Sequence, residues 1–244
     1  MPALPYYRAD LARIHHEGFG FHADAVAPGI LQLLEPVLHG RGLVVEIGCG
    51  SGLLTRYLVE AGHRVLATDA SPAMLELARA YAPGVEGLEQ LRLPDDAVPA
   101  ADAIVSVGHP LSYLDAEEQV RASVTAMAGA LRPDGVLAFD ICDYEWGEAR
   151  REQGPQVWSG DDWLLVTRTS VPDRGTFRRD MTTFVRQTAE LWRRDEEVHD
   201  NVLLATEQLP ALLAAAGVAA EVRSSFGSEA LPRGLVAVVG RRLD

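Results

Sequence analysis

Residues 44–55, which read VVEIGCGSGLLT, constrain the fold more than any other part of the chain. An apolar run containing Glu46 is followed by glycines at Gly48, Gly50 and Gly52, and a helical pattern starts at once after them. Glycine is needed where a chain turns sharply and where a ligand must approach bare backbone. The segment therefore predicts a buried parallel strand, a tight turn and a helix N-terminus that is open to a ligand.

The spacing of these glycines separates two kinds of nucleotide-binding turn. The dinucleotide fingerprint G-x-G-x-x-G requires Gly or Ala at its sixth position, where this chain has Leu53. Here the pattern is G-x-G-x-G, and Glu46 lies two residues before its first glycine. A negative charge at that place suits a cationic ligand better than a pyrophosphate. A nicotinamide-dependent dehydrogenase and a purely structural turn are the less favoured interpretations.

A second predicted strand also ends in an acid. Residues 63–69 read HRVLATD, and Asp69 lies 17 residues after Gly52, the distance expected for a helix plus a strand. A carboxylate at the end of that strand can accept hydrogen bonds from both hydroxyls of a ribose. Ser71 and Pro72 then supply an N-cap and a first helical residue.

Together these motifs resemble those of the class I S-adenosylmethionine (SAM)-dependent methyltransferases. Motif I of that family is (V/L)-(V/L)-(D/E)-(I/L/V)-G-x-G-x-G, and residues 44–52 fit it throughout. Residues 71–75, SPAML, match the usual start of the family's next helix. The resemblance covers roughly residues 40–141 and 203–243. It implies that the chain binds SAM and releases S-adenosylhomocysteine as product.

Composition and charge argue against several other classes. The chain has 244 residues, 48% of them apolar, which fits one large domain or one domain with an insertion. We find no 18-residue apolar stretch and no N-terminal signal pattern, so we expect neither a membrane span nor secretion. A net charge of −13 disfavours a nucleic-acid partner, because such partners are bound through basic patches.

The number and separation of the cysteines indicate the cellular compartment of the protein. Cys49 and Cys142 are the only cysteines and lie far apart in sequence. Such sparse use favours a reduced, cytoplasmic protein. Neither cysteine has metal-ligand spacing with the histidines, so we expect no metal site.

From residue 43 onward, strand patterns alternate with helical ones. Such alternation predicts right-handed crossovers and a parallel sheet covered on both faces. The last two strands are joined by a short link rich in Gly and Pro, so they are expected to pair antiparallel. The fold class is therefore α/β, a doubly wound, mostly parallel seven-stranded sheet with an antiparallel C-terminal hairpin. The expected strands are 43–47, 63–68, 86–90, 102–107, 135–141, 219–226 and 234–240, and the expected helices are 51–61, 71–82 and 116–131.

Residues 143–202 interrupt this alternation. A short helix or loop at 143–153 leads to three β-like runs at 161–170, 175–187 and 190–202. We expect a small antiparallel β insertion after the fifth strand, above the edge of the sheet where ligands bind in α/β folds. We interpret it as a cap over the substrate, although a surface for homo-oligomer formation is a compatible alternative. In layout it resembles amino-sugar N,N-dimethyltransferases and glycine N-methyltransferase-like enzymes.

Residues 1–40 precede the first strand and contain two helical patterns. The second, at 25–38, has apolar residues at core-facing spacing, whereas the first is crowded with tyrosine, phenylalanine and histidine. The resemblance implies a lid over cofactor and substrate, and simple packing on the domain is the alternative. The expected units are thus 1–40, a SAM-binding domain of 41–142 with 203–244, and the inserted cap.

The resemblance also assigns residues to SAM. The glycine turn should lie beside the methionine portion and the ribose, Asp69 should bind the ribose hydroxyls, and Ala70 and Met74 should flank the adenine. The adenine amine falls to Gln90 or the Leu91 backbone, because the third strand departs from the family pattern. Carbonyl groups at the end of the fourth strand should accept from the SAM amino group. The full expected set is Glu46, Gly48, Cys49, Gly50, Gly52, Asp69, Ala70, Met74, Gln90, Leu91, Ser106 and Val107.

Fewer residues can be assigned to the molecule that accepts the methyl group. In the family, the loop after the fourth strand faces the transferring methyl, which makes His109 and Tyr113 the catalytic candidates. A histidine there can orient the acceptor or remove its proton. Tyr7, His16 and Trp146 are the expected substrate-binding residues.

These observations lead to one functional expectation. The chain should methylate a nitrogen or oxygen of a small-molecule metabolite, with an amino-bearing natural product or sugar as the first guess. One alternative is an O-methyltransferase for a hydroxylated metabolite. Another is a relative that binds SAM without transferring its methyl group.

Overall fold

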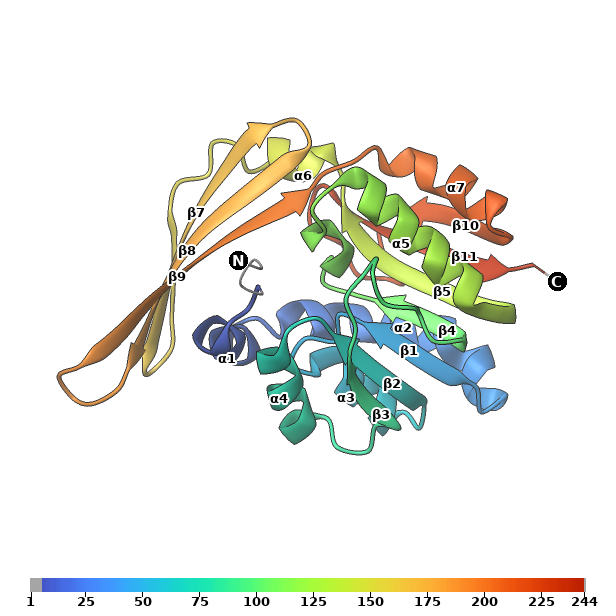
Figure 1. Cartoon of the computed structure of the whole chain (residues 1–244), viewed down its shortest axis with the longest axis horizontal. Coiled ribbons are helices and arrows are strands. Elements are labelled where there is room, and N and C mark those ends of the chain that lie inside the picture. The colour runs from blue at the N-terminus through green and yellow to red at the C-terminus, as the bar shows by residue number, and fades with distance from the viewer. Residues whose placement is uncertain (1–5, 244) are drawn as a thin grey trace.

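The computed structural model describes residues 6–243, which form two β-sheets and their covering helices (Figure 1). The larger sheet has seven strands in the order β10-β11-β5-β4-β1-β2-β3. Its strands are β1 (Leu43–Ile47), β2 (Arg64–Asp69), β3 (Gly87–Gln90), β4 (Ala101–Ser106), β5 (Leu131–Cys142), β10 (Val218–Arg223) and β11 (Leu235–Arg242). The first five pair in parallel, whereas β11 is antiparallel to both β5 and β10. The predicted mixed sheet with its antiparallel hairpin is confirmed.

The sheet is buried on both faces because helices cover each side. Helices α2 (Phe21–His39), α3 (Leu53–Glu60) and α4 (Pro72–Tyr81) pack on one face, in a core that includes Val44. Helices α5 (Glu117–Ala130) and α7 (Leu209–Ala215) pack on the other face, in a core that includes the next residue, Val45. Successive strand residues point to opposite faces, so an unbroken apolar strand serves both cores.

The insertion forms a separate sheet of four strands in the order β6-β7-β8-β9. Its strands are β6 (Gln156–Ser159), β7 (Trp163–Asp173), β8 (Thr176–Arg186) and β9 (Trp192–Val202), and the short helix α6 (Tyr144–Glu148) precedes them. The predicted three-strand meander matches β7, β8 and β9, but it omits β6. That strand is short, mostly exposed and directly preceded by Gly154 and Pro155, so it lacks the apolar alternation that marks the other three.

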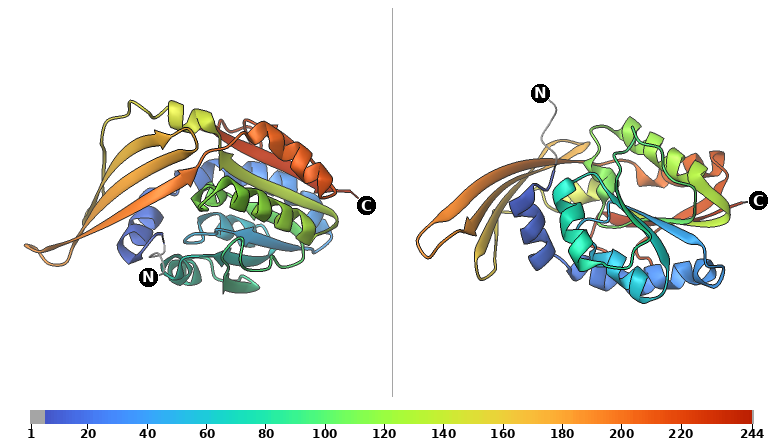
Figure 2. Two further views of the ribbon diagram at one scale, coloured as in Figure 1. Left: turned by 45° about the horizontal axis from the view of Figure 1, so that its top comes forward. Right: turned by 60° about the horizontal axis from the view of Figure 1, so that its bottom comes forward.

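The insertion sheet projects from one end of the larger sheet as a curved arm, and α1 (Ala9–Gly18) lies in the angle between them (Figures 1 and 2). Helix α1 contacts the arm through Leu11 and Ile14, which pack on Trp163, Leu165 and other apolar residues of the arm. It also contacts α4 of the larger domain. Within residues 6–243, no helix is long and apolar enough to cross a membrane.

Candidate cofactor and acceptor site

The turn after β1 holds its three glycines in left-handed backbone conformations, with φ of 71° at Gly48, 56° at Gly50 and 84° at Gly52. Residues with a side chain rarely adopt such angles. A Cβ atom at Gly48 would lie 2.4 Å from Pro110, whereas one at Gly50 would meet nothing nearer than Met74 Sδ at 4.0 Å. Gly48 is therefore required for packing, and Gly50 leaves its backbone open to a ligand.

Glu46 lies beneath this turn with 2% of its surface exposed. Its Oε2 atom is buried and has no hydrogen-bond partner among the described residues. Burial, together with the nearby charge of Asp69, raises the pKa of Glu46 to about 8. A buried carboxylate without a partner is costly, and a cationic ligand would relieve that cost.

Asp69 is fixed by the same turn. Its two carboxylate oxygens accept from the Gly50 amide at 2.8 Å and from the Ser71 amide at 2.7 Å. Burial raises the pKa of Asp69, while these amide hydrogen bonds oppose the rise. Each oxygen retains a lone pair, so the carboxylate is oriented and still able to accept from two hydroxyl groups.

The residues assigned to the adenine line the beginning of α4 and the end of β3. Met74 is buried beside Gly50. The Gln90 side chain donates to the Ala70 carbonyl at 2.8 Å, and the Leu91 amide donates to the Asp69 carbonyl at 3.1 Å. Those donors are therefore engaged, which leaves the Gln90 side-chain oxygen and the Leu91 carbonyl as acceptors for an amine.

The loop after β4 depends on an acid that the sequence did not single out. Asp140 of β5 is fully buried, and its carboxylate accepts from the Gly108 amide at 3.1 Å and the His109 amide at 2.5 Å. It also bonds His22 Nε2 at 2.7 Å. These contacts hold Gly108 and His109 in left-handed conformations directly after Ser106 and Val107. The available signal was one acid within the apolar run of residues 136–142.

His109 begins a cluster of aromatic and polar side chains. Its ring stacks on Tyr113 with centroids 5.5 Å apart, and it lies 5.4 Å from Trp146. The Tyr113 hydroxyl bonds the Tyr7 hydroxyl at 2.7 Å and accepts a hydrogen bond from Arg179. We define the acceptor cluster as His109, Tyr113, Trp146, Tyr7, Arg179, His199 and Asn201. Four of these residues are candidates from the sequence, and Arg179, His199 and Asn201 come from the insertion.

Burial, with a further contribution from Arg179, lowers the pKa of His109 to about 3. The imidazole is therefore neutral throughout the physiological range, and its buried Nδ1 has no partner among residues 6–243. A neutral ring can accept a hydrogen bond from an acceptor group, but it is a weak general base.

Tyr7 connects the acceptor cluster with the cofactor residues. Its carbonyl accepts from the Ser71 hydroxyl at 2.9 Å, and its amide donates to Glu197 of β9 at 2.8 Å. His16 lies elsewhere, since its Nδ1 bonds Ser51 Oγ of the glycine turn at 2.9 Å and its ring meets Tyr81. Of the expected substrate residues, Tyr7 and Trp146 lie in the acceptor cluster, whereas His16 lies against the glycine turn.

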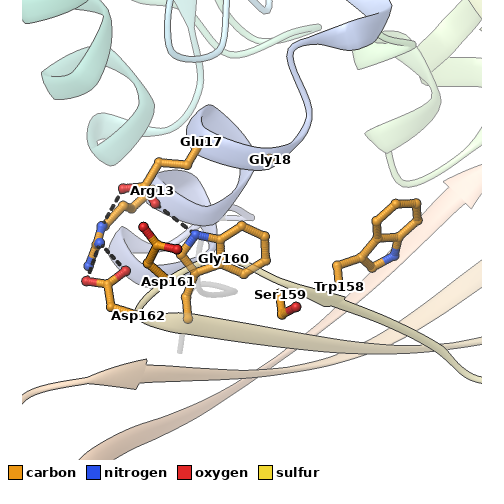
Figure 3. A pocket seen from close by; sticks show the side chains of 9 residues that line it. Arg13, Glu17, Gly18, Trp158, Ser159, Gly160, Asp161 and Asp162 are labelled. Carbon is orange, nitrogen blue, oxygen red and sulfur yellow. Dashed lines mark hydrogen bonds and ion pairs between the residues drawn. The ribbon is translucent and has the colours of Figure 1, made fainter. Parts of the chain in front are cut away.

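An open pocket of about 700 Å³ lies between α1 and the β6–β7 hairpin (Figure 3). Inside it, Arg13 pairs with Asp162 at 2.7 Å and the Trp163 indole donates to Glu17 at 2.8 Å. No residue of the glycine turn or of the acceptor cluster lines this pocket. Its contacts instead hold α1 on the insertion sheet.

The residues around the turn fit SAM. Glu46 offers a buried carboxyl oxygen without a partner among the described residues, Gly50 offers open backbone, and Asp69 offers an oriented pair of acceptors. Within residues 6–243, no cluster of histidine, cysteine and carboxylate side chains has the arrangement of a metal site.

Comparison with known proteins shows a similarity to methyltransferases. A family model described as a methyltransferase domain matches residues 44–135, which begin at the glycine turn. Over this segment the chain is similar to the class I SAM-dependent methyltransferases. An uncharacterized methyltransferase of Oceanobacillus iheyensis is 32% identical over 123 residues, covering 50% of this chain and 56% of that protein. The glycine/sarcosine N-methyltransferase of Parasynechococcus marenigrum is 28% identical over 181 residues, covering 65% and 63%. The chain thus spans 56–63% of the length of these two curated relatives.

Solved methyltransferases share the whole fold, insertion included. The sugar N-methyltransferase KedS8 of Streptoalloteichus superposes with a TM-score of 0.78 at 22% sequence identity. The alignment covers 100% of this chain and 97% of the KedS8 chain. The SAM-bound amino pentose methyltransferase CalS10 of Micromonospora gives a TM-score of 0.70 at 22% identity, with coverage of 98% and 99%. At this identity the likeness establishes the fold.

Proposed function

We propose that this protein transfers the methyl group of SAM to a nitrogen atom of a small-molecule amine. The observation that carries the choice of donor is the buried Glu46 Oε2, which has no partner among the described residues, close to the open backbone of Gly50. An anion in that place is matched by the positive charge of the donor. When bound, SAM supplies an electrophilic methyl carbon on a positively charged sulfur.

In this proposal, each side of the site has a defined task. Glu46, the glycine turn and Asp69 would hold the donor, and the backbone carbonyl groups of Ser106 and Val107 would accept from the amino group of SAM. His109 and Tyr113 orient the acceptor from the loop after β4. Methyl transfer needs the nitrogen lone pair in line with the methyl carbon, so alignment in a closed site contributes much of the acceleration.

The acid–base properties of the cluster favour nitrogen over oxygen as the acceptor atom. An alcohol must lose a proton as it is methylated, which requires an effective base, and His109 with a pKa of about 3 is a poor one. An amine needs only to be present in its neutral form. O-methylation is therefore the second candidate reaction.

Relatives and composition support a small substrate. The related glycine/sarcosine N-methyltransferase is named for a small amine as acceptor. The acidic chain, with a net charge of −13, remains unsuited to nucleic acid. Both cysteines are buried and unpaired, which agrees with a reducing, cytoplasmic setting.

The proposal is tested in two stages. Calorimetry should show that SAM and S-adenosylhomocysteine bind to the wild-type protein, with binding strongly weakened by Asp69→Ala. Methyl donation from labelled SAM should then be measured across panels of amines and alcohols. No binding of either compound would overturn the whole assignment. Tight binding without methyl donation to any acceptor would instead favour the binding-only alternative, and donation to alcohols alone would favour O-methylation.

A further inference from the structure

Two neighbouring arginines on β8 differ sharply in their partners. Arg178 points to one face of the insertion sheet and makes two hydrogen bonds of 2.7 Å to the Asp200 carboxylate. Arg179 points to the opposite face, because successive side chains of a strand alternate. Among residues 6–243, no carboxylate forms an ion pair with Arg179. The chain therefore carries an unpaired cation in the acceptor cluster, despite its large excess of acidic residues.

Arg179 is held in place by neutral groups only. One terminal nitrogen donates to the Tyr113 hydroxyl and to Asn201 Oδ1, the latter at 3.1 Å. Its Nε atom is buried and has no partner among the described residues. Tyr113 is stacked on His109, so the guanidinium lies one ring away from the histidine that follows β4.

The neighbours of Arg179 also carry donors without acceptors. Asn201 is fully buried, and its Nδ2 has no partner in the described part of the chain. Since Asn201 Oδ1 accepts from Arg179, the amide orientation is fixed with Nδ2 as the free donor. The indole Nε1 of Trp146, whose ring lies 5.4 Å from that of His109, is likewise buried without an acceptor among the described residues.

The unpartnered donors and the unpaired guanidinium charge are unfavourable unless a ligand binds to them. A buried donor without an acceptor costs about 1–3 kcal/mol, and an unpaired buried charge costs more. A guanidinium with neighbouring N–H donors is the usual recognition group for carboxylate and phosphate oxygens. The Arg179 Nε, Asn201 Nδ2 and Trp146 Nε1 donors belong to one cluster, and a substrate that carries anionic oxygens would supply the acceptors that they lack.

We propose that Arg179 and Asn201 bind an anionic oxygen group of the acceptor, a carboxylate or a phosphate. The inference rests on the proposed function and narrows it: the substrate carries both the amine that is methylated and a negative charge held by the insertion. The anion neutralises Arg179 and orients the acceptor, while its amine faces the loop that begins at His109.

Access to this subsite involves the segment before α1. The rings of Tyr6 and Tyr7 lie 4.5 Å and 5.0 Å from the ring of His199, and the Tyr7 hydroxyl bonds the Tyr113 hydroxyl. Tyr7 has φ of 55°, a conformation that is unfavourable for a bulky residue. Release of Tyr7 from this position would free the Tyr113 hydroxyl, to which Arg179 donates.

A binding experiment tests the subsite without requiring the true substrate. The protein is saturated with S-adenosylhomocysteine, and its melting temperature is measured with sodium acetate, sodium phosphate, acetamide or sodium chloride at equal ionic strength. We expect acetate or phosphate to raise the melting temperature of the wild type, whereas acetamide and chloride do not. Whichever of the two anions acts identifies the oxygen group. Equal behaviour of all four compounds would overturn the inference.

The adjacent arginine provides a matched control. Arg179→Gln should abolish the anion effect, Arg178→Gln should retain it, and Arg179→Lys should restore part of it. If Arg179→Gln does not fold, loss of the anion effect in Asn201→Leu and its weakening in Arg179→Lys decide the question. An anion effect that persists in all Arg179 and Asn201 variants would also overturn the inference.

A turnover experiment separates this inference from the proposed function. Labelled SAM is supplied with pairs of amino acids and the amino alcohols that lack their carboxylate, together with phosphorylated amines. We expect methylation of the anionic members at least tenfold above the neutral ones, with the preference lost in Arg179→Gln and kept in Arg178→Gln. Methylation of the neutral amines at the same rate as the anionic amines would contradict the anion subsite but would still agree with N-methylation. Absence of SAM binding would sink both.

Discussion

The cofactor side and the acceptor side of this site are built in different ways. Around Gly48, Gly50 and Asp69, the geometry is set by backbone: left-handed glycines and amide groups that donate to a carboxylate. Around Tyr113 and Arg179, it is set by side chains that bond one another across the β4 loop, the N-terminal segment and the insertion. A backbone-built site tolerates few substitutions, whereas a side-chain-built site can change its ligand while the fold stays the same.

The largest expected effect comes from disturbing the backbone side. Gly48→Ala places a Cβ 2.4 Å from Pro110 in a left-handed conformation, and the conformation alone costs about 1–2 kcal/mol. We expect SAM affinity to fall at least a hundredfold by calorimetry, with a lower melting temperature. Gly129→Ala in α5 is the control, because a Cβ there meets nothing within 4 Å. Normal SAM binding by the Gly48 variant would contradict a backbone-built cofactor side.

A second prediction concerns the charge beneath the turn. The pKa of Glu46 is raised to about 8, so in the free protein its carboxyl group binds a proton more tightly when folded than when unfolded. Its ionisation therefore destabilises the free protein progressively as pH rises from about 4.5 to 8. Glu46→Gln should raise the melting temperature at pH 8 and leave it unchanged at pH 4.

The same substitution should weaken the donor complex. A charge-assisted hydrogen bond contributes about 1.5–3 kcal/mol, which corresponds to a loss of SAM affinity of roughly tenfold to a hundredfold. Wild-type affinity should rise between pH 6 and 8 as Glu46 ionises, and the variant should lose that rise. An identical pH dependence in both proteins would show that Glu46 does not meet the positive charge of the donor.

His109 allows the acceptor side to be tested alone. We expect His109→Ala to lower turnover about tenfold with little change in SAM affinity, because the ring orients the acceptor and does not touch the glycine turn. The wild-type rate should show no ionisation of His109 between pH 5 and 9, since its pKa is about 3. Unchanged turnover would show that His109 has no role in the mechanism. A parallel loss of SAM affinity would show that His109 also contributes to the cofactor side.

The smallest effect is expected where α1 meets the insertion. Trp163→Phe removes the indole hydrogen bond to Glu17 and should lower the free energy of unfolding by about 1 kcal/mol. Trp158→Phe is the control, because that side chain is 43% exposed and its indole has no hydrogen bond among residues 6–243. Chemical denaturation measures both variants. SAM affinity should remain unchanged in each, as expected if the insertion does not build the cofactor side.

The same contrast explains what could be predicted from the sequence. The parallel sheet, the glycine turn and the closing hairpin follow from contiguous patterns, because a buried strand and a left-handed turn each require particular residue types. Asp140 and Arg179 could not be found in that way, since each is an ordinary residue of a strand until distant segments surround it. Likewise, the sequence places His16 near Tyr7, and only the fold directs the two side chains to different parts of the site.

The double attachment of Tyr7 has a kinetic consequence. Its carbonyl is bound by Ser71, the N-cap of the helix beside the cofactor residues, and its amide is bound by Glu197 of the insertion. Since both bonds are made by one residue, we expect a movement of Tyr7 to affect both and to link departure of the spent donor with departure of the methylated product. Such an enzyme would exchange both ligands once per opening, and the rate of that opening would set an upper limit on its turnover.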